Sequence, residues 1–283
     1  MTIKTENTSP VFVTRFAPSP TGGLHKGHAY SALLAFYEAQ KQGGRFLLRI
    51  EDIDTTRCKP EFIDDIYKDL EWLGLSWETP VRQQSDHFQD FQTALEKLKT
   101  MGMVYPCFCT RKEIQNSQPE IGPEGIIYPG TCKHLSRNSR DKLLKADKPH
   151  SWRLDLSAAL ERIGKPLSWQ DEKAGTVEAA PELLGDVILA RKDTPTSYHL
   201  SVVIDDALQQ VSHIIRGKDL WHATHIHVVL QTLFEVRQPH YWHHDLLLDE
   251  SGEKFAKRNK SVTLKSIRER GVSAADLKQE LGF

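Results

Sequence analysis

Two histidines flank a glycine in residues 15–29, which read RFAPSPTGGLHKGHA. Neutral histidines donate hydrogen bonds to phosphate oxygens without adding a fixed charge, and glycine lets a flat base approach the backbone closely. The motif follows a strand-like run and opens a helical pattern, and the N–H groups at a helix start attract anions. An HxGH string alone is often a surface feature, but the RFAPSPTG before it favours a nucleotide site containing His25, Gly27 and His28.

A charge-rich string, KFAKR, occupies residues 254–258 after the last predicted strand. Such a string is usually a solvated surface segment. Placed next to the histidines, two lysines on a loop would instead stabilise the charge that develops as pyrophosphate leaves. We therefore predict that Lys254 and Lys257 share the catalytic role with His25 and His28.

Three of the four cysteines and one tyrosine are grouped as CFC at residues 107–109 and YPGTC at residues 128–132. Three thiolates and one nitrogen or oxygen ligand suit tetrahedral zinc, and in a reducing compartment clustered cysteines indicate metal binding rather than disulfides. We expect Cys107, Cys109 and Cys132 to hold one structural Zn²⁺, with His134 or water among the choices for the fourth ligand. Three reduced cysteines in a loop without metal are the alternative.

The elements that must position these residues alternate between strand and helix. Strands are predicted at residues 11–16, 45–50, 211–215 and 245–248, and helices at residues 25–42, 61–73, 86–101, 199–209 and 220–236, with two small helices at the end. Residues 105 to about 193 are richer in proline, glycine and polar side chains, with strand-like pieces at 152–156 and 186–190. The pattern predicts an α/β fold with a doubly wound, Rossmann-type parallel sheet and a ligand at the carboxyl ends of its strands.

The same pattern divides the chain into three parts. Residues 1–104 form the first half of the catalytic domain, residues 105–194 a zinc-containing insert, and residues 195–283 the second half with the KFAKR loop and short helices. His222, His225 and His227 lie on one predicted helix, but their spacing does not put all three on one face. We interpret them as helix-surface and interdomain contacts rather than as a second metal site.

The composition sets few limits on the partners of the chain. Because the net charge is −1 over 283 residues, any contact with RNA must come from a local patch. No apolar run approaches the ~18–20 residues that span a bilayer, and the N-terminus lacks the apolar core of a signal peptide. We therefore expect a cytoplasmic protein without a membrane partner. The sequence has neither a P-loop nor a GxGxxG fingerprint that would indicate another kind of nucleotide site.

The first two motifs resemble the signatures of class I aminoacyl-tRNA synthetases, specifically their glutamyl branch. RFAPSPTG with HKGH resembles the HIGH signature, although Lys26 stands where the family commonly has an apolar residue that points away from the nucleotide. KFAKR resembles the KMSKS loop, with Phe255 and Ala256 in place of Met and Ser. Ala17 and Ser19 favour the glutamyl branch over the glutaminyl branch.

This resemblance extends from residue 11 to about residue 258 and implies L-glutamate and ATP, with Mg²⁺, as substrates. The implied ATP-binding residues are His25, Gly27, His28 and Lys257. The implied glutamate-binding residues are Arg15, Phe16, Ala17, Pro18, Ser19, Glu51, Tyr198 and Arg216. Arginine suits bidentate carboxylate binding, so Arg15 and Arg216 would hold carboxylates while Glu51 holds the ammonium group. Without the resemblance, Glu51 and Arg216 have an alternative interpretation as structural ion pairs.

The cysteine pattern narrows the resemblance. Cys-x-Cys followed by Tyr-x3-Cys resembles the zinc module of glutamyl-queuosine tRNA(Asp) synthetases. This resemblance implies that Tyr128 is the fourth zinc ligand and that the zinc holds the insert that faces the RNA. Few residues follow KFAKR, whereas complete glutamyl-tRNA synthetases continue into an anticodon-binding domain. The resemblance implies an enzyme that activates glutamate without tRNA and transfers it to queuosine in the anticodon loop of tRNA(Asp). We expect the chain to be a monomer. A truncated glutamyl-tRNA synthetase that charges the 3′ end of tRNA(Glu), and a non-catalytic zinc-containing RNA- or amino-acid-binding paralogue, are the rival hypotheses.

Overall fold

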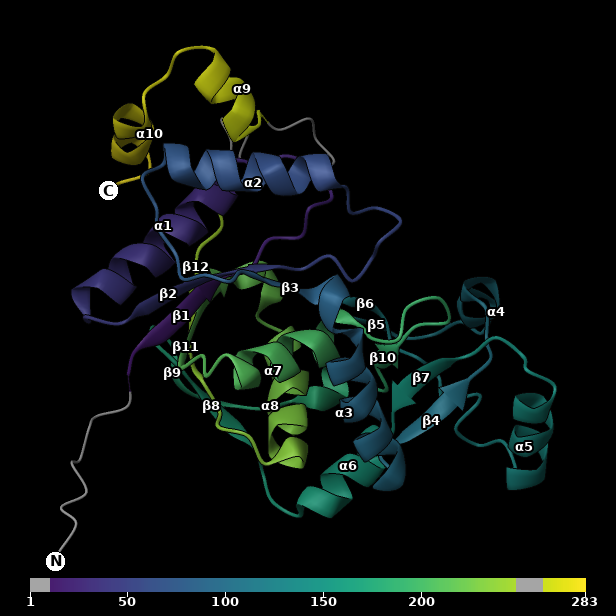
Figure 1. Ribbon diagram of the computed structural model, residues 1–283. Helices are drawn as coiled ribbons and strands as arrows, with labels where there is room; N and C mark the ends of the chain where they lie inside the picture. Colours follow the sequence, from purple (N-terminus) through teal and green to yellow (C-terminus); the bar gives the residue numbers. More distant parts are fainter. Residues whose placement is uncertain (1–10, 248–261) are drawn as a thin grey trace, which may run out of the picture.

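The computed structural model describes residues 11–247 and 262–283, and a mainly parallel sheet runs through its centre (Figure 1). Two runs of parallel strands build this sheet: β3 (Arg82–Gln83), β2 (Arg45–Ile50) and β1 (Val13–Phe16), then β11 (His213–Gly217), β12 (His240–His244) and β8 (Ser168–Asp171). The runs meet between β1 and β11, where the Ser212 N–H donates to the Val13 carbonyl oxygen over 2.9 Å. At the far edge, β9 (Gly175–Glu178) pairs antiparallel with β8.

Helices lie on both faces of the sheet (Figure 1). One face carries α1 (Lys26–Lys41), α2 (Pro60–Trp72), α9 (Leu264–Glu269) and α10 (Ala274–Glu280). The other carries α3 (Phe88–Thr100), α7 (Tyr198–Leu208) and α8 (Ala223–Phe234), with α6 (Leu156–Ile163) packed against α8. Short 3-10 turns connect these elements at η1 (Gln84–His87), η2 (Pro181–Leu183) and η3 (Lys218–Leu220). Strands with helices on both faces are the doubly wound arrangement that the sequence predicts.

A smaller lobe lies beside the sheet (Figure 1). It contains the antiparallel strands β4 (Val104–Cys107), β7 (Ser151–Leu154) and β10 (Ile188–Ala190), the hairpin β5 (Ile121–Gly122) and β6 (Gly125–Ile126), and the helices α4 (Arg111–Asn116) and α5 (Arg137–Lys145). The strands β8 and β9 fall within residues 105–194 but lie in the main sheet, where Asp171 pairs with Tyr241. The division at residues 105 and 194 remains a prediction.

The first helix of the chain has sequence signals at both ends. His25 caps its N-terminus, and Gly43, with a φ of +58°, follows its last turn in the left-handed conformation that glycine adopts readily. A Cβ on Gly44 would collide with the carbonyl oxygen of Phe12, so a second glycine is needed there for close approach. These two glycines let the chain turn directly from α1 into β2.

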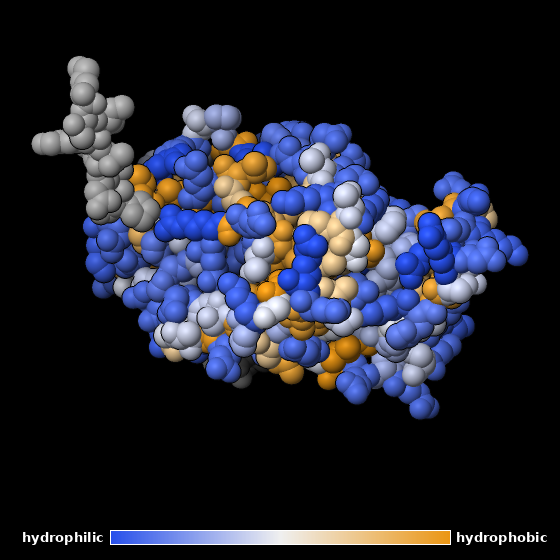
Figure 2. Space-filling view, turned by 90° about the horizontal axis from the view of Figure 1, so that it is seen from below, coloured by the Kyte–Doolittle hydropathy of each residue, from blue (hydrophilic) through white to orange (hydrophobic). Residues whose placement is uncertain are grey.

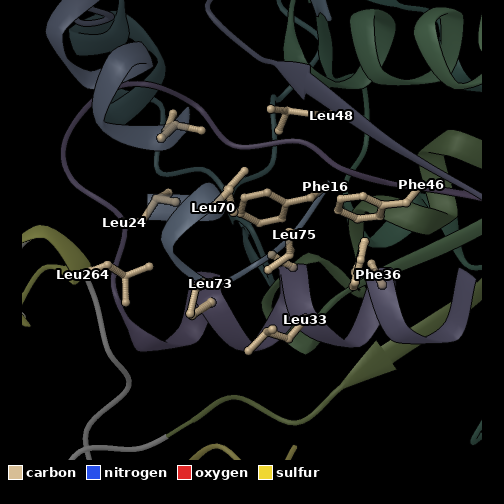
Figure 3. Packing of buried hydrophobic residues seen from close by; sticks show 14 of the residues in the cluster. Phe16, Leu24, Leu33, Phe36, Phe46, Leu48, Leu70, Leu73, Leu75 and Leu264 are labelled. Carbon is tan, nitrogen blue, oxygen red and sulfur yellow. The ribbon is translucent and has the colours of Figure 1, made fainter. Parts of the chain in front are cut away.

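The C-terminal helices are part of the main core. Figure 3 shows Leu264 of α9 beside Leu24, near Leu33 of α1. All three side chains are buried, and the Leu264 N–H donates to the Leu24 carbonyl oxygen over 2.7 Å. Burying one leucine stabilises a fold by about 1.5–3 kcal/mol. The segment after residue 261 is therefore fastened to the loop that enters the signature helix.

Most strands and helices predicted from periodicity are present, with ends that differ by a few residues. The strand predicted at residues 245–248 is wrong: β12 ends at His244, and residues 245–247 are not extended in a ladder. The sequence of β12, HYWHH, has no aliphatic residue and therefore lacks the usual strand pattern. The helix α6 and the hairpin β8–β9 were not predicted, because both lie in the polar stretch after residue 105.

The face opposite the C-terminal helices is mainly hydrophilic (Figure 2), and its apolar side chains occur in small groups between polar ones. In the part of the chain that the structure describes, buried apolar side chains instead form four internal clusters. The two largest contain residues of the helices on the two faces of the sheet. No helix in the described ranges is long and apolar enough to cross a bilayer.

Candidate active site

One cleft of about 500 Å³ opens where β1, β2, β11 and β12 end and where α1 begins. Its lining brings together the predicted amino-acid residues Arg15, Phe16, Ala17, Pro18, Ser19, Glu51, Tyr198 and Arg216 with the predicted nucleotide residues His25, Gly27 and His28. The carboxyl ends of parallel strands are where doubly wound folds bind ligands. Segments more than 200 residues apart in the sequence, such as those of Arg15 and Arg216, therefore share one cleft. The role of each residue remains a prediction.

The two signature histidines close the start of α1. The His25 Nδ1 accepts a hydrogen bond from the Gly27 N–H over 3.1 Å, and the His28 Nδ1 accepts one from the His25 N–H over 3.2 Å. In each neutral ring the proton must then sit on Nε2, which makes Nε2 a donor. The two ring centroids are 3.8 Å apart. A pair of neutral donors at the positive end of a helix favours a phosphate group.

Gly27 has a packing reason for being glycine. A Cβ at this position would lie 3.1 Å from Cε1 of the His25 ring. Any side chain would therefore press on the imidazole that caps the helix. The sequence motif thus encodes the cap as well as an open approach to the backbone.

A buried set of alternating charges lies next to the cleft. Arg49 is fully buried, and its guanidinium donates to Asp206 over 2.8 Å and to Glu51 over 3.1 Å, with Asp205 3.7 Å away. Arg15 donates to both oxygens of Asp206 over 3.0 and 3.4 Å. Burial alone would raise the pKa of Asp206, but Arg15 and Arg49 outweigh it and hold that pKa below its usual value. The charge of Arg15 is therefore already balanced within the protein.

Glu51 is a carboxylate in the cleft wall, and the nearby arginines offset only part of the cost of burying its charge. Burial raises its pKa above the ordinary value, although Arg49 and Arg15 act in the opposite direction. An arriving cation would stabilise the ionised form. The side chain is thus suited to hold an ammonium group.

Arg216 differs from Arg15, although the sequence assigns both the same cationic role. Its side chain is buried, yet its hydrogen bonds go to Tyr198, Thr224 and His243, all of them uncharged groups. No carboxylate in the described part of the chain lies within ion-pair distance of its guanidinium. A buried cation without an anion is costly, and a ligand carboxylate would offset that cost.

The predicted catalytic residues Lys254 and Lys257 lie outside the described residues. Their described neighbours on both sides are at the cleft. Leu247 lines it, and Thr263 forms an isolated β-bridge with His25.

The predicted metal ligands lie together in the smaller lobe. The Sγ atoms of Cys107, Cys109 and Cys132 are all within 4.8 Å of one another. The Cys109 Sγ is 3.4 Å from the Tyr128 hydroxyl, and the Phe108 N–H donates to the Cys132 Sγ over 3.3 Å. Three sulfur donors with one oxygen fit a tetrahedral site for zinc. His134, the alternative ligand, does not belong to the group formed by the described residues.

Several residues line the cleft that the motifs did not identify: Ser31, Ile215, Gly217, Asp219, Leu220, His244, Leu246 and Leu247. Helical spacing could have found Ser31, which lies one turn after Gly27 and contacts His244 over 2.7 Å. His244 was missed because the strand that delivers it was predicted too late in the chain.

The interpretation of two histidines as helix-surface residues needs correction. His225 and His227 are 4% and 1% exposed, so they are core residues of α8 and not helix-surface contacts. Lys26, at the position where the family has a residue that points away from the nucleotide, does not line the cleft and forms an ion pair with Glu280 of α10. Its positive charge thus joins the signature helix to the C-terminal helix.

The chain is similar in sequence to a known protein family and to several characterised proteins. Residues 11–281 match the catalytic domain of class I tRNA synthetases (E and Q). The chain is 45% identical over 281 residues to the glutamyl-Q tRNA(Asp) synthetase of Rhodobacter capsulatus, covering 96% of this chain and 100% of that protein. It is 38% identical over 274 residues to the protein of the same name from Nitratidesulfovibrio vulgaris, covering 93% and 83%.

A solved structure confirms the predicted fold class. The crystal structure of a glutamate tRNA ligase from Elizabethkingia meningosepticum, in complex with its amino acid, matches with a TM-score of 0.73 and 26% sequence identity. The match covers 88% of this chain and 52% of that ligase. The chain therefore spans about half the length of this structural relative.

Proposed function

We propose that this chain, which belongs to the class I tRNA synthetases of the E and Q group, activates L-glutamate with ATP and transfers the glutamyl group to queuosine of tRNA(Asp). Two relatives that it matches over 93–96% of its length carry the name glutamyl-Q tRNA(Asp) synthetase. The observation that carries the chemistry is the cleft of about 500 Å³, which is lined both by the start of the HKGH helix and by the buried Arg216. Among the described residues, no carboxylate lies within ion-pair distance of this arginine.

Glutamate fits the charges of the cleft. The substrate has two carboxylates and one ammonium group. The wall offers Arg216, which has no carboxylate within ion-pair distance among the described residues, and Glu51, whose pKa is raised by burial. A hydrogen bond to a charged group contributes about 1.5–3 kcal/mol. Glutamine would leave the charge of Arg216 without a counter-ion and should therefore bind less well.

Adenylation follows from the geometry at the helix start. A carboxylate oxygen of glutamate attacks the α-phosphorus of ATP, the bond to the bridging oxygen breaks, and pyrophosphate leaves. The Nε2–H groups of His25 and His28 would donate to the α-phosphate, with the amide groups of α1 behind them. Lys257 and then Lys254 would assist the departure of pyrophosphate, and Mg²⁺ would accompany the nucleotide. Positioning and electrostatics carry the step, without a covalent enzyme intermediate.

Transfer needs an acceptor hydroxyl at the same carbonyl. The hydroxyl oxygen of queuosine attacks the acyl carbon of the adenylate, AMP leaves, and the hydroxyl proton is released. A second cavity, of about 960 Å³, adjoins the first along Tyr198, which lines both. It extends into the smaller lobe past Cys109 and Tyr128. This lobe, within residues 105–194, is the part that we propose faces the anticodon loop.

Zinc would hold the lobe together and take no part in the reaction. Cys107, Cys109 and Cys132 would bind it as thiolates, with the Tyr128 oxygen as the fourth ligand. The guanidinium carbon of Arg153 lies 3.9 Å from the centre of the Tyr128 ring and would support a phenolate at that position.

Glutamate-dependent exchange of pyrophosphate into ATP, measured without tRNA, tests the activation step. We expect exchange with glutamate and much weaker exchange with glutamine. A lack of exchange with glutamate would contradict the proposed enzyme. Charging of tRNA(Asp) with and without queuosine, beside tRNA(Glu), tests the acceptor. Only queuosine-containing tRNA(Asp) should accept glutamate; charging of tRNA(Glu) would favour a truncated glutamyl-tRNA synthetase instead.

A further inference from the structure

The guanidinium of Arg216 is held in place by three neutral acceptors. Its Nε–H donates to Nε2 of His243 over 3.1 Å, Nη1 donates to the Tyr198 hydroxyl over 3.1 Å, and Nη2 donates to Oγ1 of Thr224 over 2.6 Å. Arginine carries five N–H donors. One N–H on each terminal nitrogen therefore has no acceptor within the described ranges, and these two donors remain for a ligand in the cleft.

His243 accepts from Arg216 in one tautomer only. Because an arginine Nε–H can only donate, Nε2 of His243 must be unprotonated and Nδ1 must carry the proton. Asp171 is the acceptor for that proton, with Oδ2 2.9 Å from Nδ1. Burial and the nearby charge of Arg216 lower the pKa of His243 to about 3, so the ring is neutral at physiological pH.

Asp171 is itself fixed by the backbone. Its Oδ2 accepts from the His243 N–H over 3.1 Å, and its Oδ1 accepts from the N–H groups of Lys173 and Ala174 over 3.0 and 3.1 Å. The residue ends β8, which pairs with β12, and His243 on β12 lies opposite Arg216 on β11 in the ladder. Three neighbouring strands thus deliver the chain from Asp171 through His243 to Arg216.

The imidazole separates a carboxylate from an arginine. Arg15 meets Asp206 directly and is neutralised by it, whereas His243 stands between Asp171 and Arg216. A carboxylate in direct contact with Arg216 would compete with a substrate carboxylate for the same donors. The neutral ring gives the guanidinium a fixed orientation and leaves its charge available.

Aromatic side chains keep water away from this imidazole. The ring centroids of Trp169, Trp221 and Tyr241 lie 5.4, 5.0 and 5.8 Å from that of His243, and His243 is fully buried. In such low-dielectric surroundings a hydrogen bond is electrostatically stronger, and an unpaired polar group is costly. The tautomer of His243 with its proton on Nδ1 is therefore strongly favoured over the other tautomer.

We propose that Asp171 and His243 are positioning residues that set the preference of the cleft for a substrate carboxylate over a carboxamide. Asp171 fixes the tautomer of His243, and His243 orients Arg216 without neutralising it. The inference rests on the proposed function, because the carboxylate in question is the side chain of glutamate.

Asp171→Asn is the most direct test. An amide in place of the carboxylate donates to Nδ1 of His243, so the ring proton moves to Nε2. The Nε2–H of His243 and the Nε–H of Arg216 are then two donors that face each other. In pyrophosphate exchange we expect the KM for glutamate to rise by about tenfold or more, with the KM for ATP changed less than about twofold. The kcat/KM ratio of glutamate to glutamine should fall with it.

Two substitutions of His243 separate its two contacts. In His243→Gln the amide oxygen can occupy the position of Nε2 and accept from Arg216, so a milder effect is expected. In His243→Asn the shorter amide reaches only toward Asp171 and leaves the Nε–H of Arg216 without its acceptor. Because glutamine has no tautomer to fix, Asp171→Asn should cost little more in the His243→Gln background. His225→Asn, at a buried histidine that contacts Trp169 but not Arg216, is the control and should leave both KM values near wild type.

Nitrogen-15 NMR of the wild-type imidazoles provides a second measurement, which reports the tautomer of the wild-type protein directly. His243, assigned by loss of its signal in His243→Gln, should be protonated at Nδ1 and bare at Nε2. A proton on Nε2 would overturn the inference, as would an unchanged KM for glutamate in folded Asp171→Asn. A wild-type enzyme without glutamate-dependent exchange would instead contradict the proposed function.

Discussion

Replacing Arg49 with methionine would leave the buried charges beside the cleft unbalanced. Arg49 is fully buried and contacts Glu51, Asp205 and Asp206 at 3.1, 3.7 and 2.8 Å. Removing one partner of a buried ion pair costs about 3–5 kcal/mol, because the remaining charge stays in a medium of low dielectric. With a urea m value of about 2–3 kcal/mol per molar, the midpoint of unfolding should fall by more than about 1 M.

Arg45→Met is the matched control. Arg45 makes an equally short two-bond contact with Glu78, at 2.7 and 2.6 Å, but these side chains are 42% and 45% exposed. Water and salt screen such a pair, and surface pairs contribute at most about 1 kcal/mol. The two variants remove the same guanidinium group and differ mainly in burial, so the difference between their midpoints isolates the effect of burying the charge.

The stability of Arg49→Met should depend on pH in a way that a simple packing defect would not produce. Burial already raises the pKa of Glu51, and Arg49 is among the groups that lower it. Without Arg49 that pKa rises further, so the folded variant binds a proton more tightly than the unfolded chain. The stability gap to wild type should therefore be wide at pH 8 and narrow as the pH falls toward 5.

Urea unfolding of wild type, Arg49→Met and Arg45→Met at pH 5 and pH 8 would decide the matter. If the two variants had equal midpoints at pH 8, the charge cluster would not stabilise the fold as argued. A gap between wild type and Arg49→Met that stayed constant with pH would refute the part assigned to Glu51.

Three further predictions concern the site and the lobe. Cys132→Ser should lose the bound metal and melt at lower temperature, whereas Cys58→Ser should retain it; metal analysis beside thermal unfolding checks this, and equal metal content would contradict the cysteine site. The KM for glutamate should rise as the pH falls through the raised pKa of Glu51, because a proton removes the charge that holds the ammonium group; exchange kinetics from pH 8 to pH 5 measure it, and a flat profile would speak against Glu51. Arg216→Lys keeps the charge but loses the hydrogen-bond geometry, so the kcat/KM for glutamate should fall by more than about tenfold, and near-wild-type kinetics would exclude Arg216 from substrate binding.

The sequence predicts those parts of the site that are encoded in short segments. HKGH begins a helix and caps it with its own side chains, so four consecutive residues specify the local geometry. Residues 15–19 likewise comprise the end of β1 and the loop after it, and they reach the cleft together. In both cases the functional groups are positioned by neighbours in the sequence.

The support of Arg216 could not be predicted in the same way. Asp171 and His243 reach it through the pairing of β8, β12 and β11, and neither strand pairing nor register is visible in a local pattern. The histidines of α8 were misassigned for a related reason. A period of 3.6 identifies a one-sided helix, but α8 is buried on nearly all sides, which its apolar neighbours in the run from Ile226 to Leu230 indicate better than its histidines do.

The bridge between Thr263 and His25, with Leu264 packed on Leu24, has a consequence for how the protein is made. The loop that leads into the nucleotide site acquires its packing partner only after more than 230 further residues have left the ribosome. Until then, apolar side chains of the first helix remain uncovered, and nascent chains with exposed apolar surface are those that chaperones bind. Packing around Leu24 must therefore wait for the segment around Leu264, and translation stalled before residue 262 would leave the site open at its entrance.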